Sequence, residues 1–445
     1  MLSRRALFSS SVFSAAVLLA AGAACRGQAP TPSASTTTTR QLGPAEITFL
    51  AWAGAGVESD MYHKFVADFM TRFSQIKVNL ILEANLTDEY KKLVAMVAGG
   101  AAPDVAQVHY SNGVDLAARN AIQPLDQLMA RDRISRSDYV PGVIDAFQWK
   151  GVQHAIPKDN ALRVLFYNMD MFDRAGIPYP DDTWTWETFL DVAKRLTIVE
   201  GGVVRQWGTT DIFFQMNDSP SYSLVRSFGG DLYNRDLTEF TITRDETVEA
   251  IQFSADVRAV HRVAPASNEL PAPGDAFRNG FCAMNINFAQ QVFFLKQEQR
   301  TFRYDVTVLP RGRAGHFPCA TGSAHAIPVG ARHPEHGWEL IKYLTGPQAQ
   351  RQITELKRWG SSRVDTLEAI LPTDGVPKHF KEVFIEPLQG KSKWKVIAIP
   401  IPPRAQEIAE LYDKEFADVR SGKRTAKEAA AALKPQVDAL LRSSG

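Results

Sequence analysis

The sequence of 445 residues lacks the marks of several large protein classes. Lysine and arginine number 50 against 49 aspartate and glutamate, so the formal net charge is +1 and we expect no nucleic-acid partner. The chain has only three cysteines, and the spacing of Cys282 and Cys319 matches neither a metal site nor a redox pair. These two either pair in an oxidising compartment or remain buried free thiols.

Catalytic motifs are also missing. There is no GxSxG, HExxH or Walker loop, so the chain offers no familiar nucleophile, zinc-peptidase or phosphate motif, and we predict no enzyme. The loop "WAGAGVESD" contains Gly54 and Gly56 but lacks the third glycine of a dinucleotide fingerprint. His333 and His336 have no third ligand nearby in sequence, which favours a structural role. We therefore predict neither a cofactor nor a metal.

No apolar run reaches the about 20 residues that a membrane span requires. Arg4 and Arg5 instead precede a shorter apolar stretch, residues 12–24, followed by Cys25, which is typical of an export signal over residues 1–25. "SRRALF" resembles a twin-arginine signal, and "AAGAAC" resembles a lipobox whose cysteine becomes lipidated, although Gly22 stands where leucine is usual. The alternatives are general secretion and a plain secreted protein cut before Cys25.

Residues 26–43 are rich in proline, serine and threonine and have no apolar periodicity, so we predict a disordered linker. From residue 46 onward, apolar runs alternate with helix-period segments in the order strand, helix, strand, helix, strand. This βαβαβ pattern predicts a parallel sheet covered by helices on both faces. Binding crevices in such sheets lie beyond the carboxyl ends of the strands, where the sequence has Trp52, Glu83 and residues 109–112.

Two later segments combine strand character with polar side chains. In "AIPKDNALRVLFYNMDMF" the hydrated residues of "PKDN", 157–160, stand directly before an apolar strand over 162–167. Burying an unpartnered charge is costly, so these side chains either face water or serve a ligand. In "FRNGFCAMNINF", Asn285 and Asn287 share one strand face and either bind hydrogen-bonding groups or face water, while Phe288 lies on the opposite face.

Several segments, in this order, resemble the family 1 extracellular solute-binding proteins of ABC importers, the relatives of maltose-binding protein. The matching segments cover nearly the whole mature chain: "AGGAAPDVAQV", "GVQHAIPKDNALRVLFYNMDMFDRAGIP", "TWTWETFLDVAKRLT", "FRNGFCAMNINF", "VTVLPRGRAG", "HPEHGWELIKYLTGPQAQ" and "SGKRTAKEAAAAL". The resemblance implies an α/β, two-lobed periplasmic-binding-protein fold of type II, with an interlobe cleft and three crossovers. It places lobe one at 44–158 plus 311–361 and lobe two at 159–310 plus 362–445.

Sugar sites combine aromatic faces with hydrogen-bonding side chains. Trp52, Tyr110 and Phe288 are the stacking candidates, and each of them equally suits a core. Gln290 stands where relatives often carry a stacking tryptophan, and Arg363 matches a ligand-binding arginine or forms a surface ion pair. The full predicted set of ligand-binding residues is Trp52, Glu83, Tyr110, Asn112, Asp159, Asn160, Gly229, Gly230, Asn285, Asn287, Gln290, Gly322 and Arg363.

The expected function is capture of a sugar or oligosaccharide outside the cytoplasm and delivery to the permease subunits of an ABC transporter. The alternative ligand is a polyol or a glycerol phosphate, and a phosphate would require several Arg or Lys side chains at the cleft. Two other classes are open to the sequence: an enzyme that uses Asp159 with Glu83, and a signalling or structural surface protein. We expect a monomer that is exported and lipid-anchored, facing the periplasm or the cell exterior.

Overall fold

The computed structural model describes residues 42–54, 56–270, 275–297, 302–355, 360–371 and 375–443. The predicted export signal, Cys25 and the linker up to residue 41 lie outside these described residues. Within the described residues, no helix is both long enough and apolar enough to cross a bilayer.

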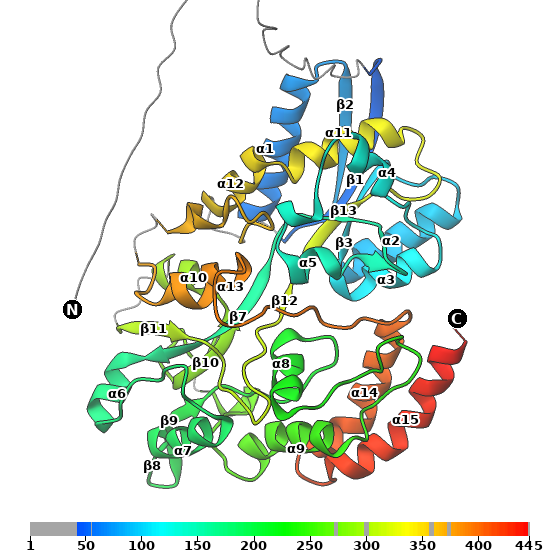
Figure 1. The fold of residues 1–445 in the computed structure, drawn as a ribbon. Coiled ribbons are helices and arrows are strands. Elements are labelled where there is room, and N and C mark those ends of the chain that lie inside the picture. The colour runs from blue at the N-terminus through cyan, green and yellow to red at the C-terminus, as the bar shows by residue number, and fades with distance from the viewer. Residues whose placement is uncertain are drawn as a thin grey trace, which may run out of the picture. The chain divides into compact units, whose positions relative to one another are not determined.

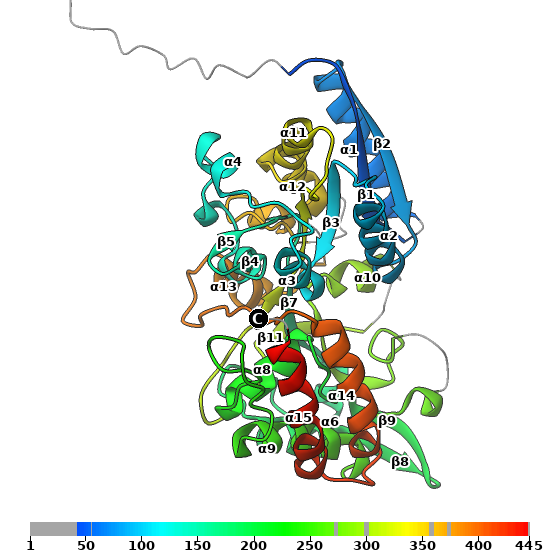
Figure 2. The same ribbon diagram turned by 90° about the vertical axis from the view of Figure 1, so that its right-hand side faces the viewer.

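The first sheet has the strand order β2-β1-β3-β13-β6. Strand β1 pairs in parallel with both β2 and β3, and α1 and α2 connect these strands, so the predicted βαβαβ pattern is confirmed (Figures 1 and 2). Strand β13 returns antiparallel to β3. The strands are β1 (Ala45–Trp52), β2 (Ile76–Glu83), β3 (Val105–His109), β6 (Ile156–Pro157) and β13 (Ser323–Ala326).

Helices cover this first sheet, and together they form the first lobe. Asn85 caps α2 by accepting a hydrogen bond from the Asp88 amide, and Pro347 begins α12, where its missing N–H costs no hydrogen bond. The elements are α1 (Val57–Arg72), α2 (Leu86–Ala98), α3 (Tyr110–Ala118), α4 (Asp126–Arg131), α5 (Pro141–Asp145), α11 (Pro334–Leu344) and α12 (Pro347–Glu355), with the hairpin β4 (Gln148–Trp149) and β5 (Val152–Gln153) and a 3₁₀ turn at Arg136–Asp138.

The second sheet has the order β11-β7-β10-β9-β8, with β12 also paired to β7. The interior strand β7 is almost wholly buried, which explains the continuous apolar run in the sequence. The strands are β7 (Ala161–Asn168), β8 (Ile198–Glu200), β9 (Val203–Thr209), β10 (Cys282–Phe288), β11 (Tyr304–Thr307) and β12 (Ala320–Thr321).

The second sheet and its helices form the second lobe. Helix α7 buries Trp186, Phe189, Leu190 and Ala193, at the i, i+3, i+4, i+7 spacing of one helical face. The helices are α6 (Met169–Ala175), α7 (Trp186–Leu196), α8 (Ser219–Phe228), α9 (Asp245–Ala259), α10 (Gln291–Gln297), α13 (Glu386–Leu388), α14 (Ala405–Arg420) and α15 (Ala426–Arg442), with 3₁₀ turns at Ser267–Glu269 and Leu367–Ile370 and a π-helical turn at Lys381–Ile385.

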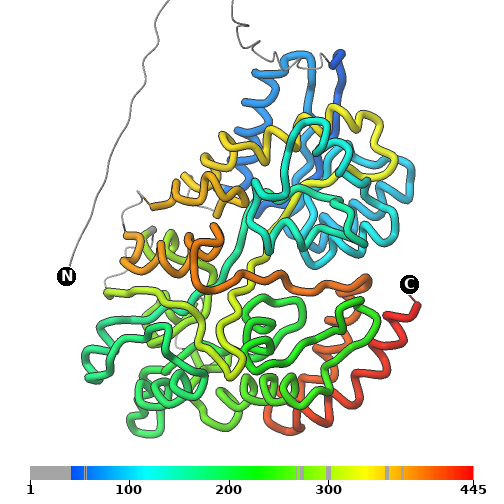
Figure 3. The backbone as a smooth tube through the Cα atoms, viewed as in Figure 1, coloured from blue at the N-terminus to red at the C-terminus, as the bar shows by residue number. Residues whose placement is uncertain are grey.

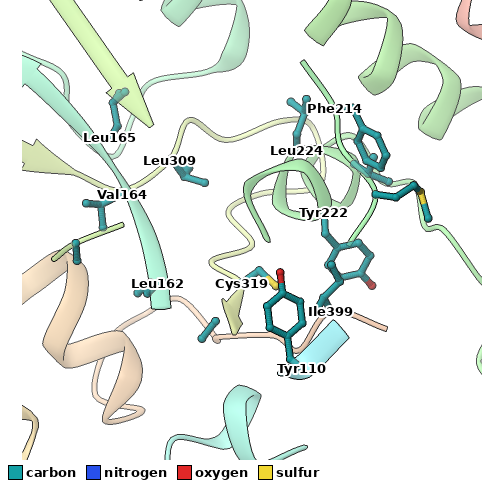
Figure 4. Close-up of a cluster of buried hydrophobic side chains, with 14 of the residues drawn as sticks. Tyr110, Leu162, Val164, Leu165, Phe214, Tyr222, Leu224, Leu309, Cys319 and Ile399 are labelled. Carbon is teal, nitrogen blue, oxygen red and sulfur yellow. The ribbon is translucent and has the colours of Figure 1, made fainter. Parts of the chain in front are cut away.

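The two lobes share part of their buried core. One apolar cluster belongs to the first lobe, whereas the larger cluster includes strand residues of both sheets. In Figure 4, Tyr110 from the first lobe lies beside Cys319 and near Tyr222 of the second lobe. The Tyr110 hydroxyl also donates to the Asn217 carbonyl at 2.5 Å. Packing and a hydrogen bond therefore join the lobes at this point.

The chain crosses from one sheet to the other more than once (Figure 3), and the strand pairing defines where it does so. It leaves the first sheet after Pro157 and enters the second at Ala161. It returns at Gly322, between β12 and β13, which is later than the lobe boundary between residues 310 and 311 that the resemblance implied. The intervening stretch stays with the second lobe because the Arg311 amide donates to the Trp184 carbonyl and the Ala314 amide donates to the Ser227 carbonyl, each at 2.9 Å. Gly312 permits this close approach, since a Cβ there would lie 2.3 Å from the Ser227 carbonyl oxygen.

Candidate functional site

A cavity of about 270 Å³ lies beyond the carboxyl ends of β1 and β3, at the junction of the two lobes. This is where a parallel α/β sheet is expected to bind a ligand. The first lobe and the crossover contribute Trp52, Glu58, Leu86, Gln107, His109, Tyr110, Lys158, Asp159, Gly322 and Ser323, and the second lobe contributes Ala161, Arg163, Asp218, Ser219, Phe288 and Thr321.

Lys158 is the central charge of the first-lobe wall and is only 2% exposed. Its ammonium lies 3.1 Å from Asp159 Oδ2 and 3.7 Å from Glu58 Oε1. Burial alone would lower the pKa of Lys158, but Tyr62, Asp159 and Glu58 more than offset this effect and raise the pKa above its ordinary value. The side chain therefore stays charged and is held by carboxylates.

Asp159 is also buried and is bound from two sides. Its Oδ1 accepts a hydrogen bond from the Ser323 amide at 2.7 Å, while Oδ2 faces Lys158. Burial raises the pKa of this carboxyl, and Lys158 offsets part of the rise. A close approach fixes the geometry, since a Cβ at Gly322 would lie 2.3 Å from the Asp159 carbonyl oxygen. Asp159 thus both lines the cavity and ties the crossover to β13.

A second charge pair faces the cavity from the second lobe. Arg163 Nη2 donates to Asp218 Oδ1 at 3.0 Å, and both side chains are about one-fifth exposed. The guanidinium carbon lies 3.8 Å from the centre of the Phe288 ring, a cation–π contact. Arg163 Nε is buried without a hydrogen-bond partner in the described part of the chain, and this donor remains unused by the protein.

Aromatic rings form the remaining wall. Trp52, the last residue of β1, lies edge-on to His109, with ring centres 6.2 Å apart, and His109 in turn contacts Tyr110 at 4.2 Å. Burial, followed by the charge of Lys158, lowers the pKa of His109 to about 3, so this imidazole is neutral. Most of the Tyr110 ring is in the core, which leaves Trp52 and Phe288 as the more accessible apolar surfaces of the cavity.

Four of the predicted ligand-binding residues meet in this cavity: Trp52, Tyr110, Asp159 and Gly322. Phe288, the stacking candidate outside that set, also lines it. Asn112 does not line this cavity but lines another one between α2, α3 and α14, and its Oδ1 accepts a hydrogen bond from the His109 amide at the start of α3. Glu83 is at the end of β2 as expected, but its carboxylate pairs with Lys92 at 2.5 Å.

Three further predicted residues do not line the cavity, and their side chains form hydrogen bonds with residues near the crossovers between the lobes. The side chain of Asn160 donates to the Ser361 carbonyl, and Gln290 Nε2 donates to the Asn160 carbonyl at 2.9 Å. Arg363 forms two hydrogen bonds of 2.9 Å with Asp365, the ion-pair alternative.

The last four predicted residues lie inside the second lobe. Strand β10 turns Phe288 to this cavity and Ile286 to a neighbouring one. On its other face, Asn285 accepts from Thr210 and Asn287 donates to Asp275. Gly229 ends α8 with a φ of +94°, and a Cβ at Gly230 would lie 2.6 Å from the Thr247 hydroxyl oxygen, so both glycines satisfy backbone and packing demands.

Sequence reasoning did not select Glu58, Lys158, Arg163 or Asp218 for the ligand set, although all of them line the cavity. Lys158 and Arg163 flank the selected "DN" pair, so their position next to the crossover was the available signal. Asp218 carried no signal, because only the fold brings it to Arg163. Cys282 and Cys319 are free and buried, which confirms the free-thiol alternative. The described residues hold no cluster of three or more metal-ligating side chains.

A family model described as bacterial extracellular solute-binding protein matches residues 55–351, more than half of the chain. The chain belongs to this family. The resemblance that the sequence motifs indicated is thereby confirmed. Among solved structures, an ABC substrate-binding protein from Listeria monocytogenes in complex with cycloalternan is similar, with a TM-score of 0.76 and 25% identity over 90% of this chain and 99% of that one. The similarity confirms the expected two-lobed fold.

Two curated relatives of similar sequence are named for different ligands. An arabinooligosaccharide-binding protein of Halalkalibacterium halodurans is 25% identical over 232 residues, which is 50% of this chain and 48% of that protein. An sn-glycerol-3-phosphate-binding periplasmic protein of Rhizobium meliloti is 24% identical over 195 residues, 41% of this chain and 45% of that protein. The solute-binding protein thus spans about half the length of these relatives in each alignment.

Proposed function

We propose that this solute-binding protein captures a neutral sugar or oligosaccharide in the cavity and delivers it to the permease of an ABC transporter. One observation carries the proposal: two separate pairs of donor and acceptor, Lys158 with Asp159 and Arg163 with Asp218, face a cavity that Trp52 also lines. Each sugar hydroxyl needs both a donor and an acceptor, and sugar C–H faces pack on aromatic rings. A cavity of this composition suits both needs.

The charges of the cavity favour a neutral sugar over a phosphate ester. Its charged side chains are two cations, Lys158 and Arg163, and three carboxylates, Glu58, Asp159 and Asp218, which leaves a formal charge of −1. Both cations are already paired with carboxylates. A phosphate prefers unpaired arginine or lysine. This balance supports a sugar and disfavours a glycerol phosphate, which remains the second candidate because of the partial similarity to glycerol-phosphate-binding proteins.

A thermal-shift screen followed by calorimetric titration tests the ligand class. The panel contains arabinose, glucose, arabino- and malto-oligosaccharides, glycerol and glycerol 3-phosphate, because a ligand of the native state raises the melting temperature. We expect a rise with at least one neutral saccharide and none with glycerol 3-phosphate. Binding of glycerol 3-phosphate alone would replace the sugar proposal with its alternative, and a response to none of the compounds would refute both.

The remaining features of the proposal concern the localisation, the oligomeric state and the lack of catalysis of the protein. We expect export, lipidation at Cys25, a monomer and no turnover of the bound ligand. Mass spectrometry of the membrane-extracted protein should find a diacylglyceryl group on Cys25, and light scattering should give one chain per particle. Recovery of bound sugar unchanged after prolonged incubation tests the absence of catalysis. A mature protein that starts at another residue would argue against the lipid anchor.

A further inference from the structure

The hairpin of β8 and β9 exposes aliphatic side chains at one edge of the second sheet. Ile198, Val199 and Val203 are 42%, 59% and 53% exposed, and they are three of the few large apolar side chains that are exposed among the described residues. Strand β8 stands last in the sheet order and is exposed along its whole length. Apolar groups gathered on a surface in this way usually mark a contact site.

The shape of the hairpin indicates what kind of partner it meets. Residues 201–202 are both glycine, with φ of +58° and +80°, and form a narrow two-residue turn. Val199 pairs with Val204 and Glu200 pairs with Val203, so Val199 and Val203 point to opposite faces of the ribbon. Figure 2 shows the hairpin extending away from the body of the second lobe. A protein partner would cover one face, whereas a lipid surface surrounds a protruding tip on both faces.

Cations lie beside these aliphatic side chains. Lys194 and Arg195 are in the last turn of α7, directly before β8, and Arg205 lies on β9. Lys194 is 3.8 Å from Asp191 and Arg205 is 3.7 Å from Glu200, and all four side chains are at least 43% exposed. Such long, exposed ion pairs are weak. Arg195 is exposed and has no hydrogen-bond or ion-pair partner among the described residues.

A separate cavity, also of about 270 Å³, adds positive charge where β9 meets the C-terminal ends of α9 and α14. Its lining contains Arg258, Arg262 and Arg420 but one carboxylate, Glu269. Arg258 and Arg420 both bind Asp211 Oδ2, at 2.7 Å and 2.9 Å, and Arg262 binds Glu269 at 3.2 Å. Together the hairpin and this cavity have six cations against four carboxylates, which suits a negatively charged partner.

We propose that the β8–β9 hairpin docks on an anionic lipid bilayer. Val199 and Val203 at the tip would enter the headgroup region, and the neighbouring cations would lie at the level of the lipid phosphates. A second copy of this chain is the other candidate occupant of the β8 edge, but a three-residue strand offers too little surface for the roughly 1,200 Å² that a stable dimer buries. This docking surface is separate from the sugar cavity and does not depend on which ligand that cavity takes.

Sedimentation with lipid vesicles tests the proposal. The protein begins at residue 26, so that neither the apolar stretch 12–24 nor a lipid on Cys25 can attach it, and both lobes are retained. The vesicles contain phosphatidylcholine alone or phosphatidylcholine mixed with phosphatidylglycerol. We expect at least tenfold tighter binding to the mixed vesicles at low salt, and release at about 1 M salt, where charges are screened within about 3 Å.

Two double variants separate the apolar and the charged contributions of the hairpin. Val199→Ser with Val203→Ser should weaken binding to the mixed vesicles at least fivefold, because it removes aliphatic surface from the tip. Arg195→Gln with Arg205→Gln should weaken it at least tenfold, because each basic residue near the surface is attracted by the anionic lipid.

The matched controls change exposed side chains of the same kinds on the first lobe: Val94→Ser with Val152→Ser, and Arg133→Gln with Arg332→Gln. Both controls should bind vesicles like the wild type, and all four double variants should keep the wild-type melting temperature. Equal binding to both kinds of vesicle, binding to neither, or full binding by the hairpin variants would overturn the proposal. A concentration-dependent dimer that Val199→Ser with Val203→Ser abolishes would also overturn it, because the hairpin would then serve a second copy of the chain.

Discussion

Glu89 offers the sharpest prediction about stability. It lies on the buried face of α2, is 0% exposed, and neither carboxyl oxygen has a hydrogen-bond partner among the described residues. Burial, followed by the charge of Glu83, raises the pKa of Glu89 from 4.5 to about 9. At neutral pH this side chain is protonated in the folded protein and ionised in the unfolded chain.

The sign of the pH effect follows from this difference. The folded state binds the proton more tightly, so the favourable contribution of Glu89 is complete below pH 4.5 and is lost as the pH rises towards 9. The loss is about 1.4 kcal/mol for each pH unit in this window. Over the 2.5 units between pH 4.5 and pH 7, the wild-type protein therefore loses about 3 kcal/mol of unfolding free energy through this group.

Glu89→Met removes the titration and keeps a side chain of similar length. Urea unfolding at a series of pH values should show the free-energy difference between variant and wild type growing by about 3 kcal/mol from pH 4.5 to pH 7, in favour of the variant. Glu89→Gln, which is uncharged but still polar, should show the same change with pH and a lower absolute stability than Glu89→Met. Parallel pH curves for wild type and variants would refute the reasoning, because they would mean that Glu89 ionises in the folded protein.

Three further outcomes are expected. Asp159→Ala should weaken sugar binding at least tenfold in calorimetry. It should also lower the unfolding free energy by about 3 kcal/mol, because the buried Lys158 loses its nearer carboxylate and keeps only Glu58 at 3.7 Å. Unchanged stability would contradict the observed pairing. Arg163→Gln should weaken binding at least tenfold but alter the melting temperature little, since the side chain is partly exposed. Cys282 and Cys319 should react with a thiol reagent only after denaturation, because burial raises the pKa of both thiols, and rapid reaction of the native protein would contradict their burial.

The sequence by itself determined the parallel part of the first sheet, β2-β1-β3, and the edge at which the site lies. Apolar runs and helix-period segments are local signals, and their alternation allows few arrangements other than a parallel sheet. Trp52 and His109 therefore lie at strand ends as predicted. The ordered motifs also sufficed for the family, because they extend over nearly the whole chain.

The tertiary structure alone decided which polar side chains meet. Asp159 and Asn160 are neighbours in "PKDN", yet Asp159 lines the cavity and Asn160 turns into the protein towards Ser361. The sequence correctly predicted that side chains of β10 alternate between two faces of the strand. Only the packing of the second lobe shows that the face carrying Phe288 meets the cavity. Arg163 and Asp218 are paired although 55 positions separate them. Local patterns determine which residues share a face, whereas the partner of that face depends on contacts between distant segments of the chain.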